Sequence, residues 1–143
     1  MNPINVLFVC VHNSARSQMA EAYLNHFGQG RFAAESAGLE PGALNPRVVE
    51  VMRESGIDIS QNKTKSVSEI LNQGKLFEYV VTVCDETAAE KCPVFPCVSK
   101  RLHWSFADPS SLTGSEEEQL RRTREIRDRI EARVRRWIAE RDG

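Results

Sequence analysis

The feature that most constrains the fold is a regular alternation of short apolar runs with segments whose apolar residues recur at helical spacing. Ile4–Val9 is a continuous apolar run and Tyr79–Val83 is rich in β-branched residues, while Arg31–Ala37 and Ser99–Trp104 are weaker strand candidates. A short run without polar alternation is typical of a strand buried on both faces of a parallel sheet. Strands that alternate with helices therefore predict a right-handed α/β fold, with helices on both faces of a parallel sheet.

The predicted helices carry recognisable start signals. Ser17–Phe27 has its apolar residues at helical spacing, and Asn45 followed by Pro46 is a favourable helix start. Ser66–Leu71 is a shorter candidate, and a long final helix begins with a capping box at Ser115. One side of that final helix is predicted to face the core, because apolar residues line it: Leu120, Ile126, Ile130, Val134, Trp137 and Ile138.

Composition limits the classes of function. A chain of 143 residues has the size of one domain, so residues 1–143 are predicted to form a single unit. The formal net charge is −1, and acidic residues interleave with the arginines of the final helix, which argues against nucleic acid as a partner. No apolar stretch reaches membrane-spanning length and no signal-like segment opens the chain. We therefore expect a cytoplasmic monomer without membrane contact, whose four cysteines are thiols rather than structural disulfides.

The loop between the first strand and the first helix carries the strongest functional signal. Such loops, at the carboxyl ends of parallel strands, are where open α/β sheets bind ligands. The loop N–H groups, the positive helix end and the two-pronged side chain of Arg16 can together surround one oxyanion. The same donors, with the hydroxyl of Ser17, would favour the thiolate form of Cys10. The predicted anion-binding residues are Val11, His12, Asn13, Ser14, Ala15, Arg16 and Ser17.

The loop is thus predicted to bind a tetrahedral anion that Cys10 attacks from one side. The alternative is a buried structural cysteine with Arg16 in solvent. The loop Cys10–Ser17 resembles the anion-binding loop of low-molecular-weight protein tyrosine phosphatases, and equally that of the arsenate reductases built on the same fold. The stretches QMAEA (18–22), ESAG (35–38) and GIDIS (56–60) are similar to the reductases, and the resemblance covers essentially the whole chain. It implies a three-layer α/β/α fold with a four-stranded parallel sheet.

Three further cysteines separate the two branches. Cys84 directly follows the strand Tyr79–Val83, and Cys92 and Cys97 come after it. The segment 81–93 resembles the redox segment of arsenate reductases that thioredoxin recharges. Reduction of arsenate to arsenite takes two electrons, which two thiols supply when they form a disulfide. The alternative for these cysteines is a zinc site, but spacings of eight and five residues fit zinc poorly, so no metal site is expected.

The resemblance implies an arsenate reductase with a thiol–disulfide relay. Cys10 would attack the arsenic, Cys84 would attack Cys10 so that arsenite leaves, and Cys92 would then form a disulfide with Cys84 that thioredoxin reduces. Asp108 lies in a stretch that resembles the acid loop of the family and would protonate the departing oxygen. On local sequence alone, Asp108 would only start a turn before Pro109. The resemblance gives Cys97 no catalytic role, so Cys97 is either a spectator or a substitute for the resolving thiol.

Two rival functions follow from the same residues. A low-molecular-weight protein tyrosine phosphatase would use Cys10, Arg16 and Asp108 in hydrolysis and would have no use for the other cysteines. A non-enzymatic thiol sensor or metalloid-binding module would bind arsenite without turnover.

A monovalent cation is the one cofactor that the resemblance raises. Asn13, Glu21 and Ser36 match positions that form a potassium site in some similar reductases, whereas Lys65 stands where an acidic partner is expected. Lys65 would then supply the positive charge itself. We therefore expect no bound cofactor, with arsenate and a thioredoxin-like dithiol protein as the partners.

Overall fold

A parallel sheet organises the part of the chain that the structure, a computed structural model, describes: residues 3–12, 15–83 and 100–142. Its four strands are β1 (Ile4–Cys10), β2 (Phe32–Gly38), β3 (Tyr79–Thr82) and β4 (Lys100–His103). They lie in the order β2-β1-β3-β4, and every neighbouring pair is parallel. The predicted parallel α/β sheet is therefore confirmed, with β1 as an inner strand.

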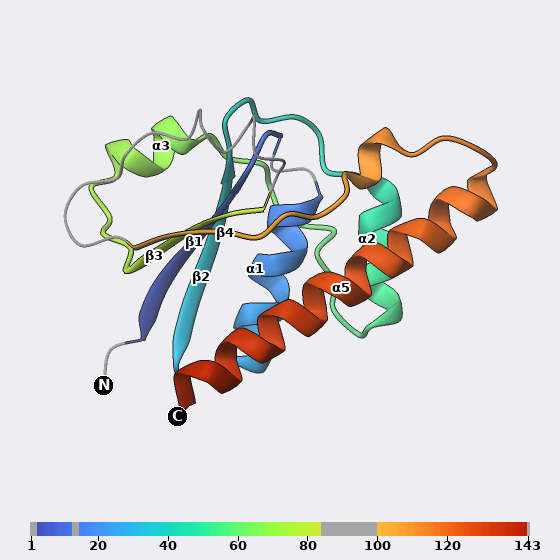
Figure 1. The fold of residues 1–143 in the computed structure, drawn as a ribbon. Coiled ribbons are helices and arrows are strands. Elements are labelled where there is room, and N and C mark those ends of the chain that lie inside the picture. Colours follow the sequence, from blue (N-terminus) through green and yellow to red (C-terminus); the bar gives the residue numbers. More distant parts are fainter. Residues whose placement is uncertain (1–2, 13–14, 84–99, 143) are drawn as a thin grey trace.

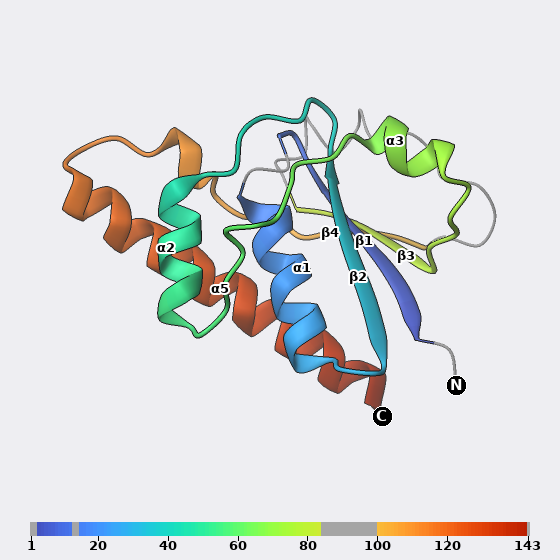
Figure 2. The same cartoon turned by 180° about the vertical axis from the view of Figure 1, so that it is seen from behind.

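Helices cover both faces of the sheet, as Figures 1 and 2 show. The helices α1 (Arg16–Phe27), α2 (Pro46–Glu54) and α5 (Glu116–Asp142) lie on one side, and α3 (Val67–Asn72) lies on the other. This is the expected three-layer α/β/α arrangement.

The central strand β1 shows why the layers form. Val6 and Phe8 are fully buried in the core cluster that includes α1, α2 and α5. Leu7 and Val9, whose side chains point to the opposite face, are fully buried against the α3 side. A strand with both faces covered has no polar alternation, so the continuous apolar run of the sequence is explained by its position.

Helix starts follow the predicted capping residues. The Asn45 side chain accepts hydrogen bonds from the N–H groups of Arg47 and Val48, at 2.9 and 3.4 Å, at the start of α2. The hydroxyl of Ser115 accepts one from the N–H of Glu118 at 3.1 Å at the start of α5. Each cap satisfies donors that the first turn of a helix leaves without an intrahelical partner.

Helix α5 buries the side that its pattern predicts. Leu120 is half-buried, and five of the predicted residues are buried in the core: Ile126, Ile130, Val134, Trp137 and Ile138. On the outer side, Arg121 pairs with Glu125 at 2.8 Å and Arg122 with Glu118 at 3.1 Å, one turn away in each case.

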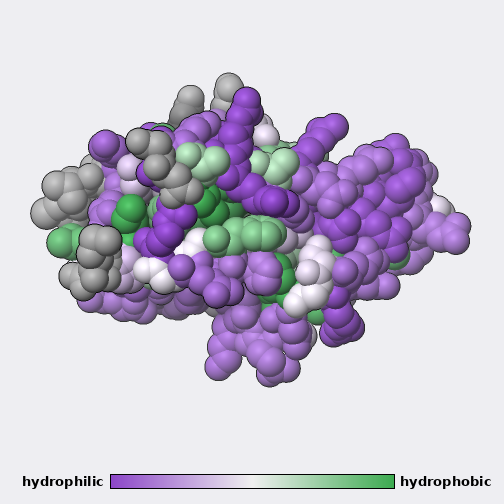
Figure 3. Space-filling view, turned by 90° about the horizontal axis from the view of Figure 1, so that it is seen from below, coloured by the Kyte–Doolittle hydropathy of each residue, from purple (hydrophilic) through white to green (hydrophobic). Residues whose placement is uncertain are grey.

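Among the described residues, no helix is both long and apolar enough to cross a bilayer. Figure 3 shows a largely hydrophilic face with small hydrophobic patches.

A charged clamp holds α2 against α5. The carboxylate of Glu54, at the end of α2, lies 2.8 Å from Nη2 of Arg124 and 3.0 Å from Nη1 of Arg127. Arg127 Nη1 also donates to the carbonyl of Val51 at 2.9 Å. Hydrogen bonds from Arg124, followed by the charges of both arginines, lower the pKa of Glu54 below its ordinary 4.5.

The clamp gives a prediction for Glu54→Gln. A carboxyl group with a lowered pKa stabilises the folded state above its ordinary pKa, and that contribution disappears as pH falls through the folded value. We expect the variant to lose about 1 kcal/mol or less at neutral pH, because the pair is partly exposed. The loss should shrink toward zero below about pH 4. Urea unfolding at both pH values measures it, with Glu78→Gln, an exposed carboxylate outside the clamp, as the control.

Candidate active site

The loop predicted to bind an anion starts at the carboxyl end of an inner strand. Cys10 is the last residue of β1 and pairs in register with Gly38, the last residue of β2. Helix α1 begins six residues later, at Arg16. The loop therefore lies where parallel α/β sheets place their ligand sites. Of the predicted loop residues, Asn13 and Ser14 lie outside the described residues.

The thiol of Cys10 is buried beside a hydroxyl group. Its side chain is 2 % exposed, and its Sγ lies 2.8 Å from Oγ of the fully buried Ser17. A hydroxyl can donate to a thiolate, and such a hydrogen bond favours the charged form of sulfur. The predicted contact between Cys10 and Ser17 is present.

The first half of the loop is held by the chain that follows β2. The N–H of Glu40 donates to the carbonyl of Val11 at 2.7 Å, and the N–H of Gly42 donates to the carbonyl of His12 at 2.9 Å. The ring Nδ1 of the exposed His12 lies 2.9 Å from the carbonyl of Glu40. These hydrogen bonds hold the backbone of Val11 and His12 against the segment that follows β2.

The second half of the loop is the start of α1. Ala15 occupies the N-cap position and has no side-chain oxygen with which to cap the helix. Its carbonyl accepts the first intrahelical bond, from the N–H of Met19 at 3.0 Å. The N–H groups of the first turn have no partner within a helix, and they carry its positive end. Acidic residues are absent from this turn, so the helix end favours an anion.

Arg16 connects the loop to a second segment of the chain. Its side chain is only 7 % exposed, its Nη1 donates to the carbonyl of Phe106 at 3.2 Å, and its Nη2 lies 3.8 Å from Oδ2 of Asp108. The alternative of an arginine in solvent is therefore wrong. The structure brings Cys10, Arg16 and Asp108 to one end of the sheet, as the sequence predicts.

Asp108 also starts a turn, so both interpretations of this residue have a structural basis. Its carboxylate accepts from the N–H of Ser110 at 2.9 Å and from the hydroxyl of Ser111 at 3.2 Å, and it caps the 3-10 turn η1 (Pro109–Ser111). The side-chain amide of Asn45 donates to the hydroxyl of Ser110 at 3.0 Å. From the sequence, Asn45 is predicted only to cap a helix. Its hydrogen bond to Ser110 is not predicted, because no local pattern relates residues 65 positions apart.

The cysteines predicted to form the relay lie outside the described residues: Cys84, Cys92 and Cys97. The alternative prediction for these cysteines, a zinc site, also falls outside the described residues. The described chain ends on this side at Val83, whose N–H donates to the carbonyl of Val9 at 2.9 Å. The residue that directly precedes Cys84 is thus hydrogen-bonded to the strand that ends in Cys10.

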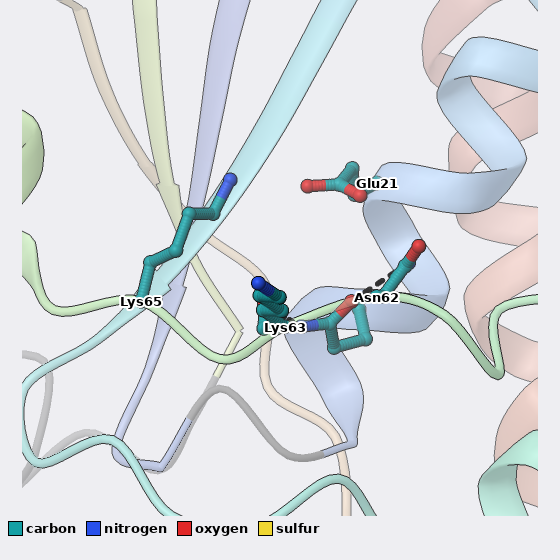
Figure 4. A pocket seen from close by; sticks show the side chains of 5 residues that line it. Glu21, Asn62, Lys63 and Lys65 are labelled. Atoms are coloured by element: carbon teal, nitrogen blue, oxygen red, sulfur yellow. Dashed lines mark hydrogen bonds between the residues drawn. The ribbon is translucent and has the colours of Figure 1, made fainter.

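The residues predicted for a potassium ion do not fit one. Ser36 donates to Oε1 of Glu21 at 2.9 Å, so two of the predicted residues meet, while Asn13 is outside the described residues. Lys65 extends toward the Glu21 carboxylate, as Figure 4 shows. An ammonium group repels a metal cation at the place where the ion would need a further oxygen ligand.

Comparison with known proteins gives a consistent result. Residues 5–142 match the sequence family described as low molecular weight phosphotyrosine protein phosphatase. An arsenate reductase of Bacillus subtilis (strain 168) is 44 % identical over 131 residues, which cover 90 % of this chain and 91 % of the relative. One from Shouchella clausii (strain KSM-K16) is 40 % identical over 133 residues, with 92 % and 93 % covered.

Solved structures share the fold. An arsenate reductase in the oxidized state is 28 % identical with a TM-score of 0.77, and 98 % of each chain is covered. A thioredoxin-dependent arsenate reductase of Corynebacterium glutamicum is 28 % identical with a TM-score of 0.70, covering 96 % of this chain and 60 % of that one. A low molecular weight protein tyrosine phosphatase from T. tengcongensis, 23 % identical with a TM-score of 0.75 over 96 % of this chain and 99 % of that one, shares the fold alone.

The contact between Cys10 and Ser17 can be tested by Ser17→Ala. A hydrogen bond to a charged group contributes on the order of 1.5 kcal/mol, so we expect roughly tenfold slower alkylation of Cys10 at neutral pH. The measurement is the iodoacetamide labelling rate of the Cys10 peptide by mass spectrometry. Ser60→Ala, at an exposed serine away from the loop, is the matched control. An unchanged rate in Ser17→Ala would show that the hydroxyl does not favour the thiolate.

Proposed function

Because the chain belongs to the low molecular weight phosphotyrosine protein phosphatase family and is 40 % or more identical to curated arsenate reductases over nine-tenths of its length, we propose that it is an arsenate reductase. That likeness to named reductases is the observation that carries the proposal. The site geometry supports anion chemistry but is common to both branches of the family, so it does not choose between reduction and hydrolysis.

The substrate in this proposal is the arsenate oxyanion, held by the loop. The N–H groups at the start of α1 and the buried guanidinium of Arg16 supply positive charge and donors in one place. The Sγ of Cys10 lies at the end of β1, where the loop that would hold the oxyanion begins. Burial of these groups removes competing water and strengthens their interaction with an anion.

The first chemical step joins sulfur to arsenic. The Cys10 thiolate attacks the arsenic atom, and one oxygen leaves with a proton that Asp108 supplies, which gives an arsenic(V) thioester-like adduct on Cys10. Asp108 suits this role by position, since Arg16 lies 3.8 Å from its carboxylate and brings it to the loop. The hydrogen bonds from Ser110 and Ser111 hold its carboxyl group in one orientation.

The reductive steps pass through sulfur. The Cys84 thiolate attacks Sγ of Cys10, the sulfur–arsenic bond breaks, and its electron pair stays on arsenic, which leaves as arsenite. Cys92 then attacks Cys84, which frees Cys10 and leaves a Cys84–Cys92 disulfide. An external dithiol protein of the thioredoxin type reduces that disulfide and so supplies the two electrons. The hydrogen bond between Val83 and Val9 supports this order, because the chain leading to Cys84 starts beside the strand of Cys10.

The surroundings proposed for the enzyme follow from this chemistry. Free thiols must persist between turnovers, and the cytoplasm maintains them in the reduced state. We place the protein there, acting as a monomer with arsenate and a thioredoxin-like protein as partners. The runner-up function is tyrosine phosphatase activity, which the description of the matched family favours.

A coupled assay separates these functions. We expect arsenate-dependent oxidation of NADPH in the presence of thioredoxin and thioredoxin reductase, because each turnover consumes two electrons. Cys84→Ser should abolish this oxidation yet leave any hydrolysis of p-nitrophenyl phosphate unchanged. The matched control is Cys97→Ser, which should retain turnover. Arsenate-dependent turnover that survives in Cys84→Ser would contradict the relay, and stoichiometric arsenite binding without turnover would favour a thiol sensor.

The relay also predicts a specific product. A single turnover without reductant should leave one disulfide between Cys84 and Cys92, whereas Cys92→Ser should stop at Cys10–Cys84. Peptide mapping by mass spectrometry under non-reducing conditions identifies the linked pair. Oxidation of Cys10 alone to a sulfur acid, with no disulfide, would rule out this sequence of steps.

A further inference from the structure

A lysine side chain extends toward a half-buried carboxylate in a cavity between α1 and the segment before α3. The cavity has a volume of about 250 Å³ and is lined by Gln18, Glu21, Asn62, Lys63 and Lys65. Asn62 donates to the side-chain carbonyl of Gln18 at 3.0 Å, which joins the two walls. Figure 4 shows Glu21 reaching into the cavity from α1 and the Lys65 side chain directed toward it.

Glu21 is a carboxylate that needs a nearby positive charge. Burial raises its pKa above the ordinary 4.5, and the negative charge of Glu35 acts in the same direction. The hydrogen bond from Ser36 at 2.9 Å and the positive charge of Lys65 act in the opposite direction. Ser36 supplies a neutral donor, so Lys65 is the positively charged group that acts on Glu21.

Lys65 is held in place by its own backbone and by a second carboxylate. Its carbonyl accepts a hydrogen bond from the N–H of Gly38 at 2.8 Å, which fixes it to the end of β2. Its Nζ lies 3.9 Å from Oε1 of Glu35, which belongs to β2 and also pairs with Lys75. The ammonium group of Lys65 thus interacts with carboxylates from two elements, α1 and β2.

We propose that the ammonium group of Lys65 is the resident cation of this cavity, shared by Glu21 and Glu35, and that it makes a bound monovalent metal ion unnecessary. The proposal concerns the junction between α1 and β2 and does not depend on the reaction that Cys10 performs. Lys65 acts here as a positioning residue, because it fixes the helix whose first turn forms half of the anion loop.

The proposal implies that a free cation can replace Lys65 once its side chain is removed. Truncation at Cβ would leave the cavity open, with the carboxylate of Glu21 and the amide oxygens of Gln18 and Asn62 in its lining. Oxygen donors of this kind are the ligands that hard cations prefer. A side chain of similar length without charge would instead fill the space and leave the carboxylates uncompensated.

The experiment compares melting temperatures of the full chain in potassium chloride and in choline chloride at equal ionic strength. The wild type should melt at the same temperature in both salts. Lys65→Ala should melt roughly 1–5 °C lower in choline and recover about half of that loss in potassium. Lys65→Met should be equally low in both salts. Lys63→Ala, which removes the same charge from the exposed rim of the same cavity, should behave as the wild type.

A second measurement uses pH, and it carries the test should Lys65→Ala prove insoluble. The groups facing Glu21 are Ser36, Lys65 and Glu35, and those facing Glu35 include Lys75. A carboxyl group with a raised pKa destabilises the fold as pH rises through that pKa. Without Lys65 this destabilisation grows. The melting temperature of Lys65→Met should therefore fall further below that of the wild type at about pH 8 than at about pH 5.

Two results would overturn the proposal. One is a wild type that potassium stabilises as strongly as it stabilises Lys65→Ala, since the cavity would then bind the ion with Lys65 present. The other is a Lys65→Ala or Lys65→Met variant that has the same melting temperature as Lys63→Ala, with no dependence of that temperature on pH or on the salt. Neither result bears on arsenate reduction, because no turnover is measured.

Discussion

The buried guanidinium of Arg16 is the interaction on which the arrangement of the site depends. A charge withdrawn from water destabilises the fold unless it is paired and hydrogen-bonded. Arg16 meets that requirement through the carbonyl of Phe106 and the carboxylate of Asp108, both of which follow β4. The need to compensate one charge therefore determines where a loop some ninety residues further along the chain must pass. Asn45 secures the far end of that loop through Ser110.

Local pattern was sufficient to predict the order and type of the described α-helices and strands, though not the short 3-10 turn η1, and their ends differ by one or two residues for identifiable reasons. β1 extends through Cys10 because Cys10 still pairs with Gly38. β2 begins at Phe32 rather than Arg31 because its pairing with β1 begins with Ile4 opposite Phe32. Strand ends depend on the partner strand, so the apolar run of a single segment cannot define them.

Contacts between distant polar groups could not be predicted. The Asn45–Ser110 bond and the clamp of Glu54 on α5 join residues 65 or more positions apart, and no periodicity marks them. Thr123 was missed for another reason: it is fully buried on the inner side of α5, and its hydroxyl bonds to the carbonyl of Gln119 in its own helix at 2.7 Å. A polar residue satisfied within its helix can occupy a core position, although its type suggests an exposed one.

The hydrogen bond between Val83 and Val9 has a consequence for kinetics. It joins the residue before Cys84 to the strand that ends in Cys10. In the proposed relay, the step between these two thiols is then intramolecular, and its rate is independent of how much enzyme the cell contains. Dilution would slow the two bimolecular steps of the proposed cycle, which are the binding of arsenate and the exchange with an external reductant. Selection could thus adjust the internal and external halves of the cycle separately.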